Sequence, residues 1–279
     1  MQPKKLLLVI AAGFTLIGFS SCKKDKTIGD GEIETTFDLS GKQAISESLT
    51  DDANNILEET IETAGLSGNK APVINSGTNS CASVVVSPGA FPKTITLDFG
   101  TGCTNPNSNI TRSGIIHIVL SDSFRITGST AVMTFDQYYV NGYHKEGIIT
   151  WTNTTTNNIK SWTRQVVNGK ITAPDGRFWL HSGLKQITQS DGGNTPHYLL
   201  DDAYTITGSS QVTNSSGNTR DAIIEIPLHK RVSCDHVDQG SIRFQGPTHF
   251  ATLDFGNGLC DNLATISIDG YSTRTITLP

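Results

Sequence analysis

Residues 94–99 read Thr-Ile-Thr-Leu-Asp-Phe, and this stretch decides the fold class. Its apolar and polar residues alternate, which is the pattern of a β-strand that is buried on one face. The same alternation recurs over residues 224–228, 251–255 and 264–268. No strand–helix–strand rhythm occurs, so the nucleotide-binding α/β folds are excluded. The sequence predicts an all-β fold, either a large curved antiparallel β-sheet or a β-sandwich, with one N-terminal amphipathic helix.

The turn signals agree with an antiparallel arrangement. Asn-Gly or Asp-Gly dipeptides stand at residues 141–142, 168–169, 175–176 and 269–270. Tight hairpins favour these dipeptides because both central residues need a positive φ. We therefore expect about a dozen or more strands, with hairpin turns at these dipeptides and a meander around residues 168–176.

An internal similarity organises the cysteines. Residues 97–103 (LDFGTGC) match residues 253–260 (LDFGNGLC) with one insertion, and each copy has an earlier cysteine upstream. Disulfides persist in exported chains, so the repeat favours the pairs Cys81–Cys103 and Cys234–Cys260. In the chain-entropy model each pair contributes about 3 kcal/mol. A zinc site is the alternative for these thiols, but no CxxC spacing occurs, and we expect no metal.

Residues 42–66 form the one predicted helix. Apolar residues recur at helical spacing, acids occupy the other face, and Gly65 is a suitable C-terminal stop. The apolar stripe comprises Ile45, Leu49, Ala53, Ile56, Leu57, Ile61 and Ala64, and the acids are Glu47, Asp51, Asp52, Glu58, Glu59 and Glu62. An acidic face argues against membrane binding. We expect the helix to dock on the all-β domain at 81–279, which carries the weak repeat, with residues 67–80 as a linker.

The N-terminus has the pattern of a lipoprotein signal. Lys4 and Lys5 precede an apolar run over residues 6–19, and two serines stand before Cys22. The run is too short for an ordinary spanning helix. We expect residues 1–21 to be a signal peptide that is removed, leaving acyl chains such as palmitate on Cys22. Residues 22–41 would then be a lipidated flexible tether. The expected location is the outer membrane, with possible exposure at the cell surface.

Composition narrows the function classes. The formal net charge is -5, and because residues 1–21 hold two lysines and no acid, the remainder carries -7. Nucleic-acid binding calls for a basic patch, so no nucleic-acid partner is expected. The sequence also has no HExxH, no GxSxG, no Gly-Lys-Ser/Thr phosphate loop and no EF-hand loop. We predict no cofactor and no catalytic residue.

Several clusters of polar residues suggest chemistry. Asp98 and Asp254 are equivalent in the repeat and suggest a glycosidase-like carboxylate pair, although an Asp that caps a glycine turn is commoner. The run 144–146 (His-Lys-Glu) is better explained as a charged strand end. Asp201-Asp202 and the run 234–238 supply too few oxygens alone for calcium.

The aromatic residues invite a further hypothesis. Three tryptophans and three tyrosines fall within residues 138–179, and exposed aromatic rings can stack on sugars. Burial in the core is the default for such residues. His117, which lies between two isoleucines, is interpreted as a solvent-facing strand histidine.

Four segments carry a family resemblance: FPKTITLDFGTGC, VNGYHKEGIITWTNT, DDAYTITG and FATLDFGNGLCDN. Through them, residues 81–279 resemble a family of uncharacterised lipoproteins from Bacteroidota. The SCKKDK run after the signal is also similar to the start of many mature lipoproteins of that group. The resemblance implies lipid anchoring and brings no activity with it.

The sequence therefore favours a lipid-anchored cell-envelope protein with a non-enzymatic binding or structural role. Its partners would be the membrane, through the anchor, and a glycan or a protein. Two alternatives stay open. One is a carrier that encloses an apolar ligand in the curved sheet, and the other is a glycan-active enzyme that uses carboxylates.

Overall fold

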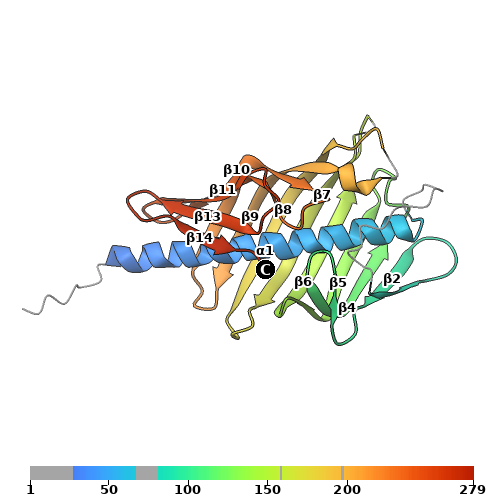
Figure 1. Cartoon of the computed structure of the whole chain (residues 1–279), viewed down its shortest axis with the longest axis horizontal. Coiled ribbons are helices and arrows are strands. Elements are labelled where there is room, and N and C mark those ends of the chain that lie inside the picture. The colour runs from blue at the N-terminus through green and yellow to red at the C-terminus, as the bar shows by residue number, and fades with distance from the viewer. Residues whose placement is uncertain (1–27, 67–80, 158, 196–197) are drawn as a thin grey trace, which may run out of the picture.

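A single long helix lies along the concave side of one curved β-sheet in the computed structural model (Figure 1). The structure describes residues 28–66, 81–157, 159–195 and 198–279. Its helix, α1, spans Ile28–Thr63, and a short 3₁₀ turn follows later at Leu199–Asp201. The fold is thus all-β with one N-terminal helix, and the sheet is a single curved layer with no second sheet packed against it in the described part of the chain.

The sheet has 14 strands, all antiparallel. They are β1 (Ser83–Val86), β2 (Lys93–Asp98), β3 (Cys103–Thr104), β4 (Thr111–Leu120), β5 (Thr130–Val140), β6 (Tyr143–Asn153), β7 (Ser161–Thr172), β8 (Phe178–Asp191), β9 (Ala203–Asn214), β10 (Thr219–Arg231), β11 (Gln239–Gln245), β12 (Phe250–Asn257), β13 (Leu263–Ile268) and β14 (Arg274–Thr277). Neighbours in sequence are neighbours in the sheet, except that β3 pairs only with β4. The sheet stays open, with β1 and β14 at its edges.

Bulges at glycines bend the sheet around α1. Register shifts recur between neighbouring strands, for example between Ser113 and Ile115 on β4. A Cβ on Gly114 would lie 1.9 Å from the carbonyl oxygen of Gln137, and one on Gly240 would lie 2.4 Å from that of Pro227. Both glycines also have a positive φ. Because only glycine permits such close backbone approach, these positions bend the strands and produce the curvature.

The helix starts earlier than the sequence predicted. Residues 28–41, expected as part of a flexible tether over 22–41, form the first turns of α1, and Ile33 and Phe37 are buried there. Gly31 and Gly41 hide this segment in the sequence because glycine lowers intrinsic helix propensity. Burial against the sheet outweighs that loss, since packing supplies most helix stability in proteins. At about 1.5 Å per residue, α1 is about 54 Å long.

The C-terminal end of α1 is as predicted. Gly65 adopts a φ of 68°, and its N–H donates to the Glu62 carbonyl while the N–H of Leu66 donates to Ile61. This is the Schellman arrangement, in which a left-handed residue closes the helix. The expected linker at 67–80 lies outside the described residues.

The turn predictions are right at three positions and wrong at one. Residues 141–142, 175–176 and 269–270 connect β5 to β6, β7 to β8 and β13 to β14. Asn168-Gly169 instead lies within β7, where the register shifts against β8. Asn168 has a φ of 53°, and a bulge needs that conformation as much as a hairpin does. The neighbouring strands therefore form the expected meander, but with one turn fewer.

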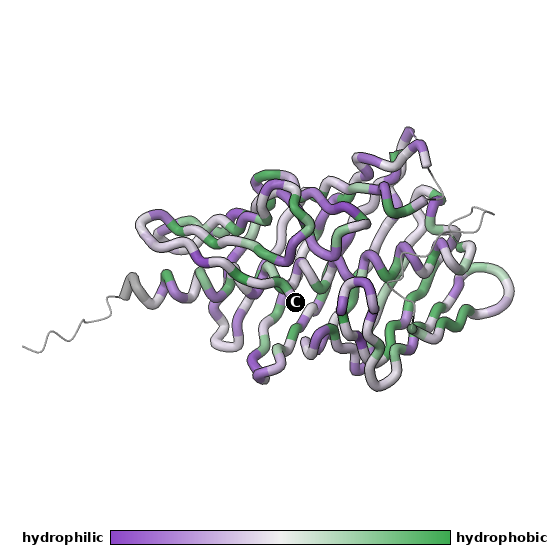
Figure 2. The backbone as a smooth tube through the Cα atoms, viewed as in Figure 1, coloured by the Kyte–Doolittle hydropathy of each residue, from purple (hydrophilic) through white to green (hydrophobic). Residues whose placement is uncertain are grey.

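Polar residues line the interior as well as the surface. Figure 2 shows hydrophilic and hydrophobic residues interspersed along α1, although the sheet surrounds most of the helix. Six acids on α1 are buried, namely Glu47, Asp51, Asp52, Glu58, Glu59 and Glu62. The sequence placed them on the polar face of the helix, but in the structure that face also packs against the sheet.

Candidate functional site

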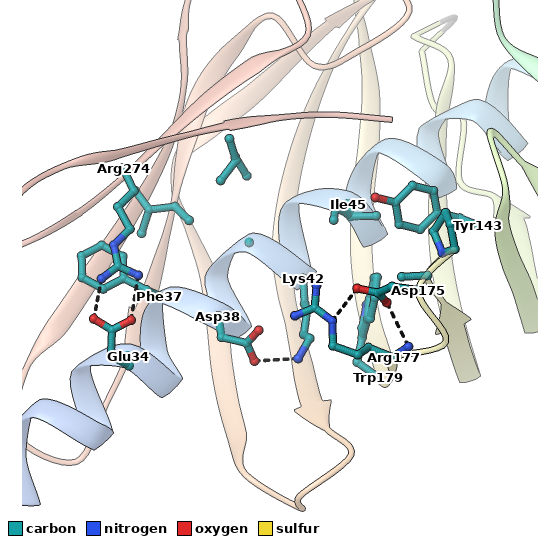
Figure 3. A pocket seen from close by; sticks show the side chains of 15 residues that line it. Glu34, Phe37, Asp38, Lys42, Ile45, Tyr143, Asp175, Arg177, Trp179 and Arg274 are labelled. Carbon is teal, nitrogen blue, oxygen red and sulfur yellow. Dashed lines mark hydrogen bonds and ion pairs between the residues drawn. The ribbon is translucent and has the colours of Figure 1, made fainter.

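One stripe of α1 is left uncovered by the sheet, and a groove runs along it (Figure 3). The helix positions that line it are 34, 37, 38, 41, 42 and 45, whose spacing of three and four places them on one face. β13 and β14 form one wall, and Tyr143 with the β7–β8 turn (residues 173–177) forms the other. The groove has a volume of about 560 Å³. Its helical floor is about 16 Å long.

The floor of the groove is apolar. Phe37 of α1 and Trp179 of β8 are buried beneath it, at 3% and 2% exposure. The Trp179 indole N–H donates to Ser46 Oγ at 2.9 Å, so its polar group is satisfied inside the protein. Ile45 and Ile276 pack on the core and are only partly buried. The groove therefore offers an apolar surface to a ligand without burying an unpaired polar group.

Gly41 lies in the middle of this floor. A Cβ added there would meet only Ile266 Cδ1, at 3.9 Å, which is an ordinary contact. Packing and backbone conformation therefore do not require glycine, and glycine inside a helix costs about 1 kcal/mol relative to alanine. A larger side chain at this position would project into the groove and occupy it. Helix stability alone would favour alanine at position 41, whereas glycine leaves the groove open.

Three ion pairs form the rim. Arg274 donates two hydrogen bonds to the Glu34 carboxylate, at 2.9 and 2.5 Å, and its guanidinium lies 3.8 Å from the ring centroid of Phe37. Lys42 donates to Asp38 at 2.6 Å.

The third rim pair lies at the far end of the groove. The Arg177 guanidinium donates to Asp175 at 2.7 Å. The backbone amide and the side chain of Arg177 both lower the pKa of Asp175. Exposed pairs of this kind contribute little to stability, so they can exchange partners with a charged ligand at small cost.

A different set of ion pairs fixes α1 inside the sheet. Arg164 of β7 donates to Asp51 at 2.7 Å and lies 3.6 Å from Glu47. Lys185 of β8 also pairs with Glu47, and Arg112 of β4 pairs with Asp52. All of these side chains are buried. Because removing one partner of a buried pair is strongly destabilising, this network makes the helix position specific.

Burial and crowding alter the charge state of two groups in this interior. Burial, followed by the field of Arg164, lowers the pKa of Lys145 to about 7, and its ammonium donates to Thr50 Oγ1 at 3.2 Å. Burial, followed by Lys145 and Lys185, lowers the pKa of His181 well below its usual range. His181 is therefore neutral at pH 7.

The C-terminal part of α1 carries a third such group. Burial, followed by repulsion from Asp202, raises the pKa of Glu58 to about 7. Asn54 donates to its carboxylate at 3.1 Å. Lys160 pairs with Asp202 at 3.0 Å and partly offsets the negative charge. Glu58 thus lies near half-protonation at neutral pH.

The predicted cysteine pairs come together. Cys81 and Cys103 lie with their Cα atoms 5.8 Å apart, and Cys234 and Cys260 lie 5.2 Å apart, both as disulfides. The first joins the segment before β1 to β3, and the second joins the β10–β11 and β12–β13 connections. The lipidation residue Cys22 lies outside the described residues.

The two repeat aspartates are not brought together. Asp98 Oδ1 accepts the Gly100 amide at 2.7 Å, and Asp254 Oδ1 accepts the Gly256 amide at 2.7 Å. Nine interstrand steps separate β2 from β12, roughly 43 Å along the sheet. Both residues are turn caps, as the commoner use of Asp in this position predicts.

The run His144-Lys145-Glu146 divides between the two faces of the sheet. His144 stacks on Tyr139, and Glu146 pairs with Lys170 at 2.8 Å. The run lies at the start of β6, as the strand-end interpretation expects, but Lys145 points inward and is buried. The bulge at Gly147 changes the alternation and conceals its direction in the sequence.

The other candidate clusters also have internal partners. Asp202 accepts from Lys160, and Asp238 pairs with both His229 and Arg231. Among the described residues no group of three or more His, Cys, Asp or Glu side chains is placed to hold a metal ion. His117, half-buried on β4, lies 3.4 Å from Thr96 Oγ1.

All three tryptophans belong to the core. Trp151, Trp162 and Trp179 are 1%, 5% and 2% exposed. They therefore offer no stacking platform for a sugar on the outer face of the sheet. Trp151 donates its indole N–H to Asn54 of α1 at 2.9 Å, which shows that the aromatic block serves to seat the helix.

Comparisons with protein-family models, curated proteins and solved structures found no match for this chain. Over the described ranges, α1 included, no helix combines the length and the apolar character needed to cross a membrane.

Proposed function

We propose that this chain is a lipid-anchored protein of the cell envelope with a non-enzymatic binding role, and that the groove beside α1 is its binding site. The observation that carries the proposal is an uncovered helix stripe with an apolar floor, a glycine at its centre and exchangeable charges on its rim. An incoming apolar group would cover Ile45 and Ile276, which are only partly buried. Charged groups of the ligand would take over rim partners such as Arg177.

The location rests on two features. The signal-like N-terminus ends at Cys22, and two cysteine pairs elsewhere form disulfides, which persist in oxidising compartments. Both support export, and acyl chains on Cys22 would hold the domain at the outer membrane. The resemblance to uncharacterised Bacteroidota lipoproteins supports the same location. Cys22→Ala should abolish labelling by a clickable fatty acid, and persistent labelling would refute the anchor.

The carrier alternative is less favoured. It requires an apolar cavity between the concave face and the helix, lined by residues in phase with Leu97 and Leu253. Both leucines are fully buried, and α1 occupies that face. The enzyme alternative named Asp98 and Asp254, which are turn caps on distant strands. The groove is therefore the opening that we propose for the ligand.

A fluorescent probe with apolar rings and one sulfonate, 1-anilinonaphthalene-8-sulfonate, tests the groove. Gly41→Phe fills the floor and should weaken probe binding at least tenfold. Gly31→Phe is the matched control, because Gly31 lies on the same helix, outside the groove, with open space around its Cα. Both changes replace glycine within α1, so their effects on helix propensity cancel in the comparison. Equal binding by the wild type and Gly41→Phe would exclude the groove as the site.

A further inference from the structure

β14, which forms one wall of the groove, is one of the two edge strands of the sheet. β14 pairs with β13 on one side, and no described strand pairs with its other side. Leu278 donates its N–H to the carbonyl of Asn262, across from it in the register. Hydrogen-bonding direction alternates along an antiparallel strand. The N–H and C=O groups of Thr275 and Thr277 therefore point away from β13.

The side chains of β14 alternate in the complementary sense. Arg274 and Ile276 face α1 and line the groove, whereas Thr275 and Thr277 are exposed. A strand added beside β14 would lie about 4.8 Å further across the groove. Every second side chain of that strand would then point onto the helix floor near Gly41 and Ile45. One added strand would therefore bond to the outward backbone groups of β14 and also place its side chains on the apolar floor.

The dimensions and charges favour a peptide as the occupant. A floor of about 16 Å matches about five extended residues at about 3.3 Å each. Charges of both signs stand on the rim, with Arg274 and Glu34 beside Phe37 and with Arg177 and Asp175 at the β7–β8 turn (Figure 3). A mixed-charge rim suits a polypeptide with polar residues between apolar ones. A single acyl chain uses neither the rim charges nor the free backbone groups.

Building on the proposed function, we infer that the groove binds an extended segment of a partner protein, apolar at alternate residues, which adds to β14 as a fifteenth strand. Main-chain hydrogen bonds to Thr275 and Thr277 supply affinity, as in other cases of strand addition. The apolar floor selects the side chains that point inward. An unpaired edge next to an apolar groove is what this mode of recognition needs.

Thr275→Pro tests the edge directly. Its N–H points away from β13, so proline leaves the β13–β14 ladder intact while removing an outward donor. Val84→Pro is the matched control on the opposite edge. Ser87 donates to the Thr94 carbonyl, so by the same alternation the Val84 N–H also points away from the sheet.

The experiment selects binders from a phage-displayed library of nonapeptides on the purified chain carrying Cys22→Ala. Enriched peptides should alternate apolar and polar residues. A bound peptide should slow amide exchange at Thr275 and Thr277 at least tenfold. Thr275→Pro should weaken peptide binding at least tenfold, and Val84→Pro should leave it within twofold.

The outcomes separate this inference from the proposed function. Strand addition is overturned if the peptides bind without slowing amide exchange at Thr275, or if they bind Thr275→Pro as tightly as the wild type. The groove proposal stands in that case if Gly41→Phe still abolishes peptide binding. An unproductive library overturns strand addition as well, and the fluorescent probe then decides the groove proposal alone. A dimer that Thr275→Pro dissolves would show that the occupant is a second copy of this chain, which also contradicts the inference.

Discussion

Arg164 is the side chain whose loss should reveal most clearly how α1 is held. It lies on β7 at 2% exposure, donates to Asp51 at 2.7 Å and approaches Glu47 to 3.6 Å. Glu47 keeps Lys185 as a second partner, and this field, against the opposing effect of burial, lowers its pKa. Arg164→Leu therefore leaves the buried Asp51 carboxylate without its arginine partner.

The expected magnitude follows from that burial. Removing one partner of a buried ion pair typically costs about 3–5 kcal/mol, because an uncompensated charge stays in the interior. For a domain of this size, about 1 kcal/mol lowers Tm by about 2–4 °C. Arg164→Leu should therefore lower Tm by about 6–20 °C. Adding Asp51→Leu removes the stranded charge and should restore most of the loss, since buried pairs are often replaceable by apolar residues.

Thermal unfolding followed by circular dichroism measures these values. Arg177→Leu is the matched control, because its pair with Asp175 is exposed on the rim of the groove. It should leave Tm unchanged. If Arg164→Leu and Arg177→Leu behave alike, or if the double variant is less stable than Arg164→Leu, the buried network does not hold the helix as described.

Three further predictions concern pH, curvature and the disulfides. Because the folded-state pKa of Glu58 is about 7 and the reference value is 4.5, stability should fall as pH rises from about 4.5 to 7. Glu58→Gln should remove that fall and stabilise the protein by up to about 3 kcal/mol at pH 8, which urea unfolding at several pH values would show. If the wild type and Glu58→Gln lose stability in parallel as the pH rises, the prediction is refuted. Gly114→Ala places a Cβ against a carbonyl and should lower the soluble yield severely. Gly128→Ala is the control, because Gly128 also has a positive φ but has open space around it, and it should cost about 1 kcal/mol of stability. If the two variants lose stability and soluble yield to a similar extent, the bulge at Gly114 does not shape the sheet. Replacing Cys81 and Cys103 by Ser should cost about 3 kcal/mol in urea, and unreduced peptide maps that join Cys81 to another cysteine would contradict the pairing.

Much of the sheet was predictable because local patterns and global fold agree there. The alternation over residues 94–99 predicted β2, and Ile95 and Leu97 face the core. The dipeptide at 141–142 gave a two-residue hairpin. The repeat chose one cysteine connectivity out of three, which spacing alone does not do. Each of these depends on a few neighbouring residues.

The errors arise where the sheet encloses the helix. An amphipathic pattern implies that the polar face meets water, but α1 has almost no such face beyond residue 45. A signal for this was present in the strands, because Arg164 stands in phase with Trp162 and Lys185 in phase with Ile187. Cations at core positions imply buried acids opposite them. Recognising that Glu47 and Asp51 are those acids requires the three-dimensional register.

The groove could not be read from the sequence because its parts lie far apart along the chain. Phe37, Tyr143, Arg177 and Arg274 meet only when the sheet curls round α1. Four of its six helix positions also fall in residues 34–41, which resemble a polar tether. From the sequence alone, Gly41 indicates a flexible segment. Only the structure shows that it lies in the floor of the groove, beside Ile266.

Amide hydrogen exchange along α1 tests the central claim most directly, because the groove exists only if residues 34–41 are helical. We predict slow exchange from residue 32 to residue 63, with exchange at 34–41 comparable to that at 47–58. Fast exchange over 34–41 beside a protected 42–63 would mean that this segment is a tether. The groove, the proposed function and the strand-addition inference would then fall together.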